Sequence, residues 1–388
     1  MKIAIDCRWI FPQTSGIGQH TRLLIQGLHA RHPPHDWVLL FDDPARAETV
    51  AAELGCDWPC AVLPYTLFSP QNQVKLPRWL RQHKVDVYHS TNYMMPLPGF
   101  PRHHPGKVKA VITIHDLIPM MFRDHAPRSR KSRLFPLYAF LMRQVAARAD
   151  AIITVSHSSR NDIIRMLRLP AGTHDKVQVI YNGLDPHFHP DPDTPRKSPP
   201  EILYVGRLDP YKNVPQLVSA FGQARKDLPF GTRLRVIGPP DERYPEAMNI
   251  ARQLELFPHM DWEGHVDDAT LLDAYRRAAV VVLPSHYEGF GLPVAEAMAC
   301  GTPVICSQAS SLPEVAGDAA ILIPPGDLRA LTHALREVLG TPKTAARLAA
   351  AGPEQAARFT VDRMARETLS LYETLGNHPK TPNLETPT

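Results

Sequence analysis

Short runs of aliphatic and β-branched residues alternate with longer segments of helical periodicity along almost the whole sequence. In the first half we predict strands at Lys2–Asp6, Trp37–Phe41, Val85–His89, Val111–His115 and Ala151–Val155. In the second half we predict strands at Ile202–Val205, Leu234–Ile237, Val280–Leu283, Pro303–Cys306 and Ala320–Ile323. Most of these runs are apolar at every position, which is typical of parallel strands that are buried on both faces.

Helices are predicted between the strands of both halves. They cover Gly18–Ala30, Ser158–Leu167, Val214–Gln223, Asp268–Arg277 and Leu328–Leu339. A strand, a helix and a parallel strand in succession form the unit of a doubly wound α/β sheet. A chain of 388 residues has enough material for two domains of roughly 100–200 residues each. The sequence therefore predicts an α/β protein with two Rossmann-like domains, residues 1–185 and residues 201–360.

A proline-rich segment separates the two halves. Six of the 40 prolines lie in residues 186–200, which we predict to be a stiff linker between the domains. The same segment contains Asp191-Pro192-Asp193, a pattern found in metal sites, but no strand flanks it and we expect no metal there. Residues 376–388 are polar and rich in Pro and Thr, so they are predicted to form a disordered tail.

The net charge of +4 is too small to indicate a dedicated nucleic-acid-binding protein. It hides an asymmetry, because residues 1–185 carry 23 Lys and Arg against 14 Asp and Glu, whereas the remainder carries 20 against 25. This difference indicates that the two halves meet different partners. Five cysteines, an odd number, fit a reducing compartment better than a disulfide framework. With no signal-peptide core and no membrane-spanning apolar run in the sequence, we expect a cytoplasmic protein that can still touch a membrane.

Open α/β sheets bind ligands at the carboxyl ends of their strands, so the residues that follow each strand are the first candidates for chemistry. The most informative stretch is SHYEGFGLPVAEAMACGTPV, residues 285–304. Glu288 lies on a glycine-rich loop, and Pro293 is predicted to open a helix whose N-terminus favours an anion. Glu296 is expected in the first turn of that helix, where a carboxylate also complements the helix dipole. Two carboxylates beside an anion pocket predict a ligand with both phosphates and sugar hydroxyls.

Two further loops contribute weaker signals for phosphate binding. In residues 204–214, Arg207 and Lys212 bracket a turn after a predicted strand, where two cations suit a diphosphate but can also be a solvated surface. Residues 14–24 form a glycine-rich turn before the first helix. The dinucleotide fingerprint G-x-G-x-x-G fails there because position 21 is Thr, which disfavours a dinucleotide-dependent dehydrogenase.

His115 and Asp116 end the predicted strand at residues 111–115. A histidine in such a place is often an ordinary core residue. Its position at the predicted cleft edge indicates a functional role instead.

The segment of residues 121–142 combines basic and apolar character. Its apolar and aromatic run, Leu134–Met142, follows five basic residues: Arg123, Arg128, Arg130, Lys131 and Arg133. Basic residues beside exposed apolar ones suit an anionic membrane surface. The alternative is a surface loop followed by a core helix.

Together these motifs make the chain resemble the retaining, nucleotide-sugar-dependent glycosyltransferases of family 4, which have the GT-B fold of two facing Rossmann-like domains. The most specific element is the E-x7-E motif from Glu288 to Glu296, followed by AMACGTPVI. The elements Gly206-Arg207-Leu208…Lys212, SGIG at residues 15–18, VSHSSRNDI and VIYNGLD also match, and the resemblance runs from residue 1 to about 375.

The resemblance implies roles for the candidate residues. Arg207 and Lys212 would hold the donor diphosphate and stabilise the departing nucleotide, without a metal ion. Glu296 would bind the ribose hydroxyls, and Glu288 would contact the donor sugar as a positioning or electrostatic group. The remaining expected contacts to substrate come from His115, Asp116, Gly16, Gly18 and the backbone N–H groups of Phe290, Gly291 and Leu292.

The resemblance also implies that residues 361–375 form a helix that packs back on the first domain. A tail element that often contains Trp reads RFTVDRMA here, which leaves the packing of this helix open.

The expected activity is transfer of a hexose from a nucleotide sugar to a glycan or lipid-linked acceptor in cell-surface polysaccharide assembly. GDP-mannose is favoured as donor over a UDP-hexose. The alternatives are a UDP-hexose-dependent glucosyl- or galactosyltransferase and a nucleotide-sugar 2-epimerase of the same fold. A binding protein without catalysis is disfavoured because both glutamates and both cations are present.

Overall fold

The computed structural model describes residues 1–11, 15–102, 107–122 and 135–376. Within these residues the first half of the chain forms a seven-stranded parallel sheet in the order β3-β2-β1-β4-β5-β6-β7. Its strands are β1 (Lys2–Asp6), β2 (Asp36–Phe41), β3 (Cys60–Val62), β4 (Val87–Ser90), β5 (Lys109–Thr113), β6 (Ala151–Thr154) and β7 (Val177–Val179).

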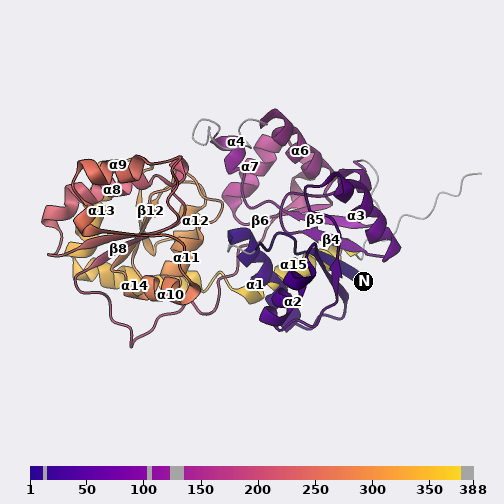
Figure 1. Cartoon of the computed structure of the whole chain (residues 1–388), viewed down its shortest axis with the longest axis horizontal. Coiled ribbons are helices and arrows are strands. Elements are labelled where there is room, and N and C mark those ends of the chain that lie inside the picture. The colour runs from indigo at the N-terminus through magenta and orange to yellow at the C-terminus, as the bar shows by residue number, and fades with distance from the viewer. Residues whose placement is uncertain (12–14, 103–106, 123–134, 377–388) are drawn as a thin grey trace, which may run out of the picture.

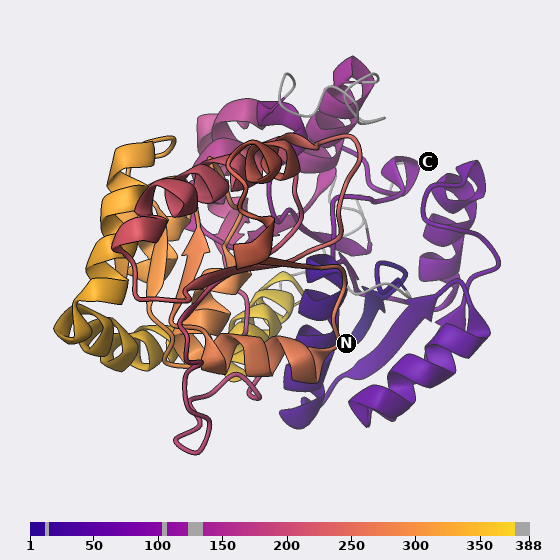
Figure 2. The same cartoon turned by 60° about the vertical axis from the view of Figure 1, so that its left-hand side comes forward.

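The second half forms a separate parallel sheet, which in the described residues has six strands in the order β10-β9-β8-β11-β12-β13. These strands are β8 (Glu201–Val205), β9 (Arg233–Ile237), β10 (Met260–Glu263), β11 (Val280–Leu283), β12 (Val304–Ser307) and β13 (Ala320–Ile323). Figure 1 shows the two sheets side by side in two domains, and Figure 2 shows helices covering them from a second direction. The prediction of two doubly wound α/β domains is therefore confirmed.

Helices cover both faces of each sheet. The first sheet is enclosed by α1 (Gly16–Ala30), α2 (Pro44–Leu54), α3 (Pro70–Gln82), α4 (Ile118–Met121), α6 (Phe135–Arg148) and α7 (His157–Leu167). Around the second sheet lie α8 (Val214–Ala224), α9 (Glu246–Gln253), α10 (Asp268–Arg277), α11 (Leu292–Ala299), α12 (Leu312–Ala316), α13 (Leu328–Gly340) and α14 (Pro342–Ala356). The last helix, α15 (Val361–Gly376), returns to the first domain (Figure 1).

All ten predicted strands and all five predicted helices are present, with ends that shift by at most two residues. The sequence does not predict β3, β7 and β10. Each of these three is an edge strand with partly exposed residues, so its sequence lacks the continuous apolar run that marks a strand buried on both faces.

The first domain is built around two hydrophobic clusters, one on each face of its sheet. One cluster joins the sheet to α3, α6 and α7, and the other joins it to α1, α2 and α15. Met364, Ala365 and Tyr372 of α15 are buried in the second cluster, and the Tyr372 hydroxyl lies 2.5 Å from Nδ1 of His89 on β4. The C-terminal helix therefore completes a core of the N-terminal domain.

The chain passes between the domains twice, at neighbouring places. The backbone N–H of Leu184 donates to the carbonyl of Phe359 at 2.8 Å, and Leu184 pairs with Thr360 in an isolated parallel bridge. The proline-rich residues 186–200 do not span a gap between the domains. They lie along the C-terminal domain, where Arg196 donates to the carbonyl of Gly301 at 2.6 Å. Its guanidinium is satisfied by backbone carbonyls, which holds the segment in place.

Gly27 on α1 allows the close approach of α15, and its substitution tests this packing. A Cβ at this position would lie 2.7 Å from Cγ1 and 2.9 Å from the carbonyl oxygen of Val361. We expect Gly27→Ala to lower the free energy of unfolding by about 1–3 kcal/mol through overpacking, measured by urea denaturation. Gly172→Ala is the matched control, because a Cβ there meets no atom within 4 Å. Equal stability of the two variants would contradict the assigned packing.

Candidate active site

The candidate site lies where loops at the carboxyl ends of the two sheets meet. Gly289, on the loop after β11, touches the loop after β5, and a Cβ at this glycine would lie 2.6 Å from the carbonyl oxygen of His115. The Gly289 carbonyl accepts hydrogen bonds from the hydroxyls of Ser156 at 2.7 Å and Ser159 at 3.2 Å. Because both serines belong to the N-terminal domain, this contact holds the Glu288 loop against that domain.

Two more contacts join the domains around this junction. The hydroxyl of Tyr287 donates to Oδ2 of Asp162 at 2.9 Å, and burial, with this carboxylate, raises the pKa of Tyr287. Glu314 on α12 accepts from the backbone N–H of His157 at 2.8 Å, at the first residue of α7. A carboxylate at a helix N-terminus is favourable, so this contact stabilises the closed arrangement of the two domains.

Lys212 and Glu288 form a largely buried ion pair in the C-terminal domain. Nζ of Lys212 lies 2.7 and 2.9 Å from the two carboxylate oxygens of Glu288, and the side chains are only 12% and 8% exposed. Ser285 donates its hydroxyl hydrogen to the same carboxylate at 2.7 Å, and Ser310 accepts from the Glu288 backbone N–H. The pair fixes an ammonium and a carboxylate together at the inner edge of the cleft.

Arg207 lies on the exposed side of the same edge. Its guanidinium pairs with Asp209 at 2.7 Å, and its side chain is 66% exposed. The hydroxyl of Tyr204 donates to the Arg207 carbonyl at 2.7 Å, which fixes the backbone of this loop. The structure therefore joins Lys212 directly to Glu288, whereas Arg207 keeps its own carboxylate partner and an accessible head group.

The loop between Glu288 and α11 presents backbone N–H groups. Among the described residues, none of the N–H groups of residues 289–292 donates to a protein acceptor. Pro293 occupies the first turn of α11, as predicted, and Gly291 caps the helix with a φ of 97°. Unpaired N–H groups at a helix start form a place suited to an anion.

The expectation that Glu296 lies in the first turn of this helix is wrong. Because α11 begins at Leu292, after the left-handed Gly291, Glu296 falls in the second turn and the first turn carries no acidic residue. Its Oε2 accepts from the hydroxyl of Tyr275 on α10 at 2.8 Å. Burial raises the pKa of Glu296 to about 7, and the nearby Asp185 and Asp268 act in the same direction.

Glu296 lines a cavity of about 490 Å³ between the domains. The walls come from the start of α1, the chain crossover at residues 182–188, the first half of α10 and Leu292. Gly16 lies in this wall, and a Cβ at Gly16 would reach Leu292 at 3.9 Å. The cavity is mostly apolar with a few polar groups, which is the usual character of a small-molecule site.

His115 lies at the end of β5 with one ring nitrogen committed to the protein. Nε2 lies 3.1 Å from the carbonyl oxygen of Thr91, so Nε2 carries the proton and Nδ1 remains an acceptor. Burial lowers the pKa of His115 to about 4, so the ring is neutral at physiological pH. A neutral ring of this tautomer can accept a hydrogen bond from a hydroxyl.

His20 on α1 is a candidate that the sequence analysis misses. Its ring meets the ring of His115 edge to face at 4.8 Å, and its Nδ1 donates to the amide oxygen of Asn182 at 2.8 Å. The side chain is 5% exposed, its Nε2 has no partner among the described residues, and it lines the inter-domain cavity. A histidine in the middle of an amphipathic helix carries no signal in the sequence, because its partner Asn182 is 162 residues away.

Gly18, Asp116 and Phe290, which were also expected to contact substrate, lie in different surroundings. Gly18 lies in the first turn of α1, where its N–H donates to the hydroxyl of Ser15. Asp116 accepts from the backbone N–H of Ile118 and lies against Gly289. The side chain of Phe290 is buried in the core, so only its backbone groups remain available to a ligand.

The Asp191-Pro192-Asp193 pattern in the proline-rich segment lies in a turn. The carboxylate of Asp191 accepts a hydrogen bond from the hydroxyl of Thr194 at 2.6 Å, and no group of three metal-ligating side chains gathers anywhere in the described residues.

In the basic and apolar segment of residues 121–142, residues 123–134 lie outside the described residues. On α6, Leu137, Phe140 and Leu141 are 53%, 54% and 38% exposed. No helix in the described parts of the chain combines the length and apolar character needed to cross a membrane.

Comparisons with known proteins agree with this two-domain architecture. Residues 14–188 match the family model Glycosyltransferase Family 4, and residues 188–355 match the model Glycosyl transferases group 1. The O-antigen chain mannosyltransferase B of Escherichia coli is 29% identical over 347 residues, covering 82% of this chain and 81% of that protein. A glycogen synthase of Mycobacterium tuberculosis is 31% identical over 296 residues, covering 75% and 69%.

Solved structures show the same fold. A sucrose-phosphate synthase from Thermosynechococcus elongatus superposes with a TM-score of 0.73 at 21% identity, covering 96% of this chain and 98% of that one. HepE from Anabaena, solved in complex with UDP and glucose, gives a TM-score of 0.73 at 18% identity, covering 96% and 100%. The fold and the inter-domain cleft thus define a GT-B protein. The chain belongs to the group 1 glycosyltransferases and is a glycosyltransferase of glycan biosynthesis.

The raised pKa of Glu296 predicts a pH-dependent cost to folding. The folded state binds the Glu296 proton more tightly than the unfolded state, so the stabilising effect of this proton is lost as the pH rises from about 4.5 through about 7. Glu296→Gln retains an acceptor for Tyr275 without the charge, so its melting temperature relative to wild type should be higher at pH 8 than at pH 5. The exposed Glu242→Gln serves as control. A difference independent of pH would contradict the assignment.

Proposed function

We propose that the protein is a retaining, metal-independent hexosyltransferase that moves mannose from GDP-mannose to a glycan or lipid-linked oligosaccharide. The observation that carries the proposal is the buried Lys212–Glu288 pair beside the unpaired N–H groups of residues 289–292. Together with the accessible guanidinium of Arg207, these groups offer positive potential for a diphosphate at the mouth of the cleft. A carboxylate and two neutral histidines nearby suit the hydroxyls of a sugar.

The charges of the cleft match the demands of the reaction. The bond between the anomeric carbon and the donor phosphate oxygen breaks, and its electron pair stays on that oxygen. Lys212, Arg207 and the start of α11 stabilise this negative charge without requiring a metal ion. The acceptor oxygen bonds to the anomeric carbon on the same face, and its proton passes to the departing phosphate. Glu288 holds Lys212 in place and faces the developing positive charge of the sugar.

Glu296 and His115 suit the hydroxyls of the donor's nucleoside and sugar. Ionised Glu296 accepts hydrogen bonds from the ribose hydroxyls, and Nδ1 of His115 accepts one from a hydroxyl of the donor sugar. Mannose is favoured because three relatives are named as mannosyltransferases: the O-antigen enzyme, an MMP alpha-(1->4)-mannosyltransferase of Mycolicibacterium hassiacum and the serotype-specific WbdA. A UDP-hexose is the alternative donor, supported by the HepE complexes with UDP and UDP-glucose.

The outward face of α6 supports contact with an anionic membrane surface. Leu137, Phe140 and Leu141 are exposed on it, and the five basic residues of the preceding segment are adjacent in sequence. Apolar side chains inserted at the lipid boundary and cations at the head groups reinforce one another. This face would place the enzyme peripherally at the cytoplasmic side of a membrane, next to a lipid-linked acceptor.

A double-mutant series at the ion pair separates stability from catalysis. Lys212→Met leaves a buried, unpaired carboxylate and should lower the free energy of unfolding by about 3–5 kcal/mol. Adding Glu288→Gln should restore most of that stability. Transfer should fall at least about 100-fold in both single variants and in the double variant, whereas exposed Lys226→Met should keep wild-type activity and stability. A double variant that regained transfer would refute the assigned role of the pair.

The products of the same assay test the reaction class. The anomeric configuration, read by NMR, should be retained in the glycan product. Donor incubated alone should stay unchanged, since conversion to another nucleotide sugar would identify the 2-epimerase alternative.

A thermal-shift screen tests the donor base. GDP should stabilise the protein by roughly 2.7 kcal/mol at a hundred times its dissociation constant, and UDP and ADP should stabilise it less at equal concentration. A larger effect of UDP would replace the mannosyl proposal with the UDP-hexose alternative. Equal effects of the three nucleotides would remove the basis for naming a donor base.

Membrane contact is tested by co-sedimentation with vesicles of phosphatidylglycerol and phosphatidylcholine. The variant Leu137→Ser/Phe140→Ser should weaken vesicle binding by about tenfold or more, because two apolar side chains are lost from the bound face. The matched control is Leu254→Ser/Phe257→Ser, which removes two exposed apolar side chains from the C-terminal domain. Equal binding by both variants would contradict docking through α6.

A further inference from the structure

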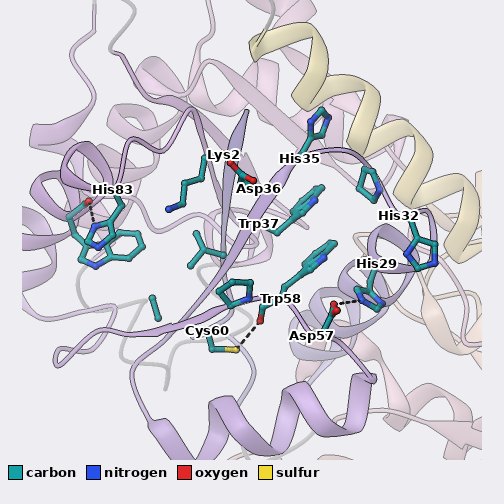
Figure 3. Close-up of a pocket in the computed structure, with 15 residues that line it drawn as sticks. Lys2, His29, His32, His35, Asp36, Trp37, Asp57, Trp58, Cys60 and His83 are labelled. Carbon is teal, nitrogen blue, oxygen red and sulfur yellow. Dashed lines mark hydrogen bonds and ion pairs between the residues drawn. The ribbon is translucent and has the colours of Figure 1, made fainter.

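A second pocket lies on the N-terminal domain at the opposite edge of its sheet from the cleft. Its volume is about 830 Å³, and it is open to solvent at the amino ends of β1, β2 and β3 (Figure 3). Lys2 and Asp36 start the paired strands β1 and β2 at its centre, and Cys60 starts β3. Since β1 has five residues, the pocket is separated from the cleft by roughly 17 Å of strand.

Aromatic rings dominate two sides of this pocket. Three of the five tryptophans of the chain line it. Trp37 and Trp58 stack with ring centroids 4.2 Å apart and planes 3° apart, and His29 meets Trp58 edge to face. Figure 3 shows His83 on the opposite side of the pocket from Trp37 and Trp58. The rings of His83 and Trp79, at the end of α3, stack with their centroids 4.0 Å apart. The pocket therefore lies between two stacked aromatic pairs that already hold each other in place.

The same pocket contains polar groups without protein partners. Trp37 is only 5% exposed, yet its indole Nε1 has no hydrogen-bond partner among the described residues, and the same holds for Nδ1 of the neighbouring His35. Both atoms are covered by protein, so they lie behind the wall of the pocket, and the groups that a ligand can reach are the exposed ones. Asp36 and Asp57 add exposed carboxylates, of which Asp57 already pairs with Nε2 of His29 at 2.9 Å, while Lys2 supplies one cation.

This combination favours a neutral carbohydrate over other ligands. Sugar rings place their C–H faces on aromatic rings and exchange hydrogen bonds through their hydroxyls with carboxylates and ring N–H groups. A phosphate would meet two aspartate carboxylates in a lining that contains one lysine and four histidines. A protein partner would need large exposed apolar side chains, and none of those found in the described residues lines the pocket.

We propose that this pocket binds a neutral oligosaccharide, the part of the growing acceptor glycan that lies several sugars behind the reacting end. The identity of the glycan rests on the proposed function. A chain held at both the pocket and the cleft binds more tightly than one held at the cleft alone, because the second contact is intramolecular. The enzyme should therefore prefer long acceptors to short ones.

Tryptophan fluorescence of the full chain provides the direct test. Titration with mannopentaose or maltopentaose should give a saturable change for at least one of them. Trp58→Ala and Trp79→Ala should each raise its dissociation constant about tenfold. Trp262→Phe, in the C-terminal domain, should leave it unchanged. Asp36→Ala, a surface substitution, should also weaken binding. The thermal shift with the donor nucleotide should be retained in every variant, which shows that the variant is folded.

Transfer assays separate this proposal from the proposed function. In the Trp58 and Trp79 variants, KM should rise for long acceptors, while kcat and the KM for a disaccharide acceptor stay unchanged. The proposed oligosaccharide site would be refuted if neither oligosaccharide gave a saturable response, or if both tryptophan variants kept wild-type affinity. The proposal would also be refuted if light scattering showed self-association that Trp58→Ala abolishes, because a second copy of the chain would then occupy the pocket. Saturable binding without any transfer would contradict the proposed function and leave the pocket intact.

Discussion

The contact between the two domains is centred on one backbone approach, in which Gly289 lies against the carbonyl of His115. The contact needs a residue without a side chain, and Ser156 and Ser159 fix it by donating to the Gly289 carbonyl. Glu288 precedes this glycine, so the same contact sets the distance between the Glu288–Lys212 pair and the neutral ring of His115. Candidate catalytic groups from opposite domains are positioned together by a junction of backbone atoms, which has few ways to shift.

The domains are also joined by the C-terminal helix, which returns from the second domain to the core of the first. The C-terminal helix α15 buries Met364, Ala365 and Tyr372 against the sheet of the first domain, after the chain has returned beside Leu184. The two crossings lie next to each other, at the wall of the inter-domain cavity that contains Glu296. Any relative movement of the domains therefore bends the chain at the edge of the cavity, while both cores stay packed.

The sequence predicted the fold and the main chemical groups because both depend on local patterns. Continuous apolar runs identified the central strands. The edge strands β3, β7 and β10 were not predicted, because they are partly exposed and their sequences lack such a run. Glu288 and Lys212 were found because each follows a strand, at the edge where parallel sheets bind ligands. Their direct contact joins residues 76 positions apart, and no spacing rule contains it. His20 was missed for the same reason, since its partner Asn182 lies in the crossover segment, 162 residues further along the chain.

The sequence by itself determined that the chain forms two doubly wound domains and carries two glutamates, two cations and a glycine-rich loop at strand ends. These follow from periodicity and from the chemistry of single residues. Only the tertiary structure decided that Glu296 lies one turn inside its helix with a raised pKa, that His20 meets His115 at the cavity, and that three tryptophans gather around one pocket. Burial and long-range contacts set these properties, and both arise only when distant segments are packed together.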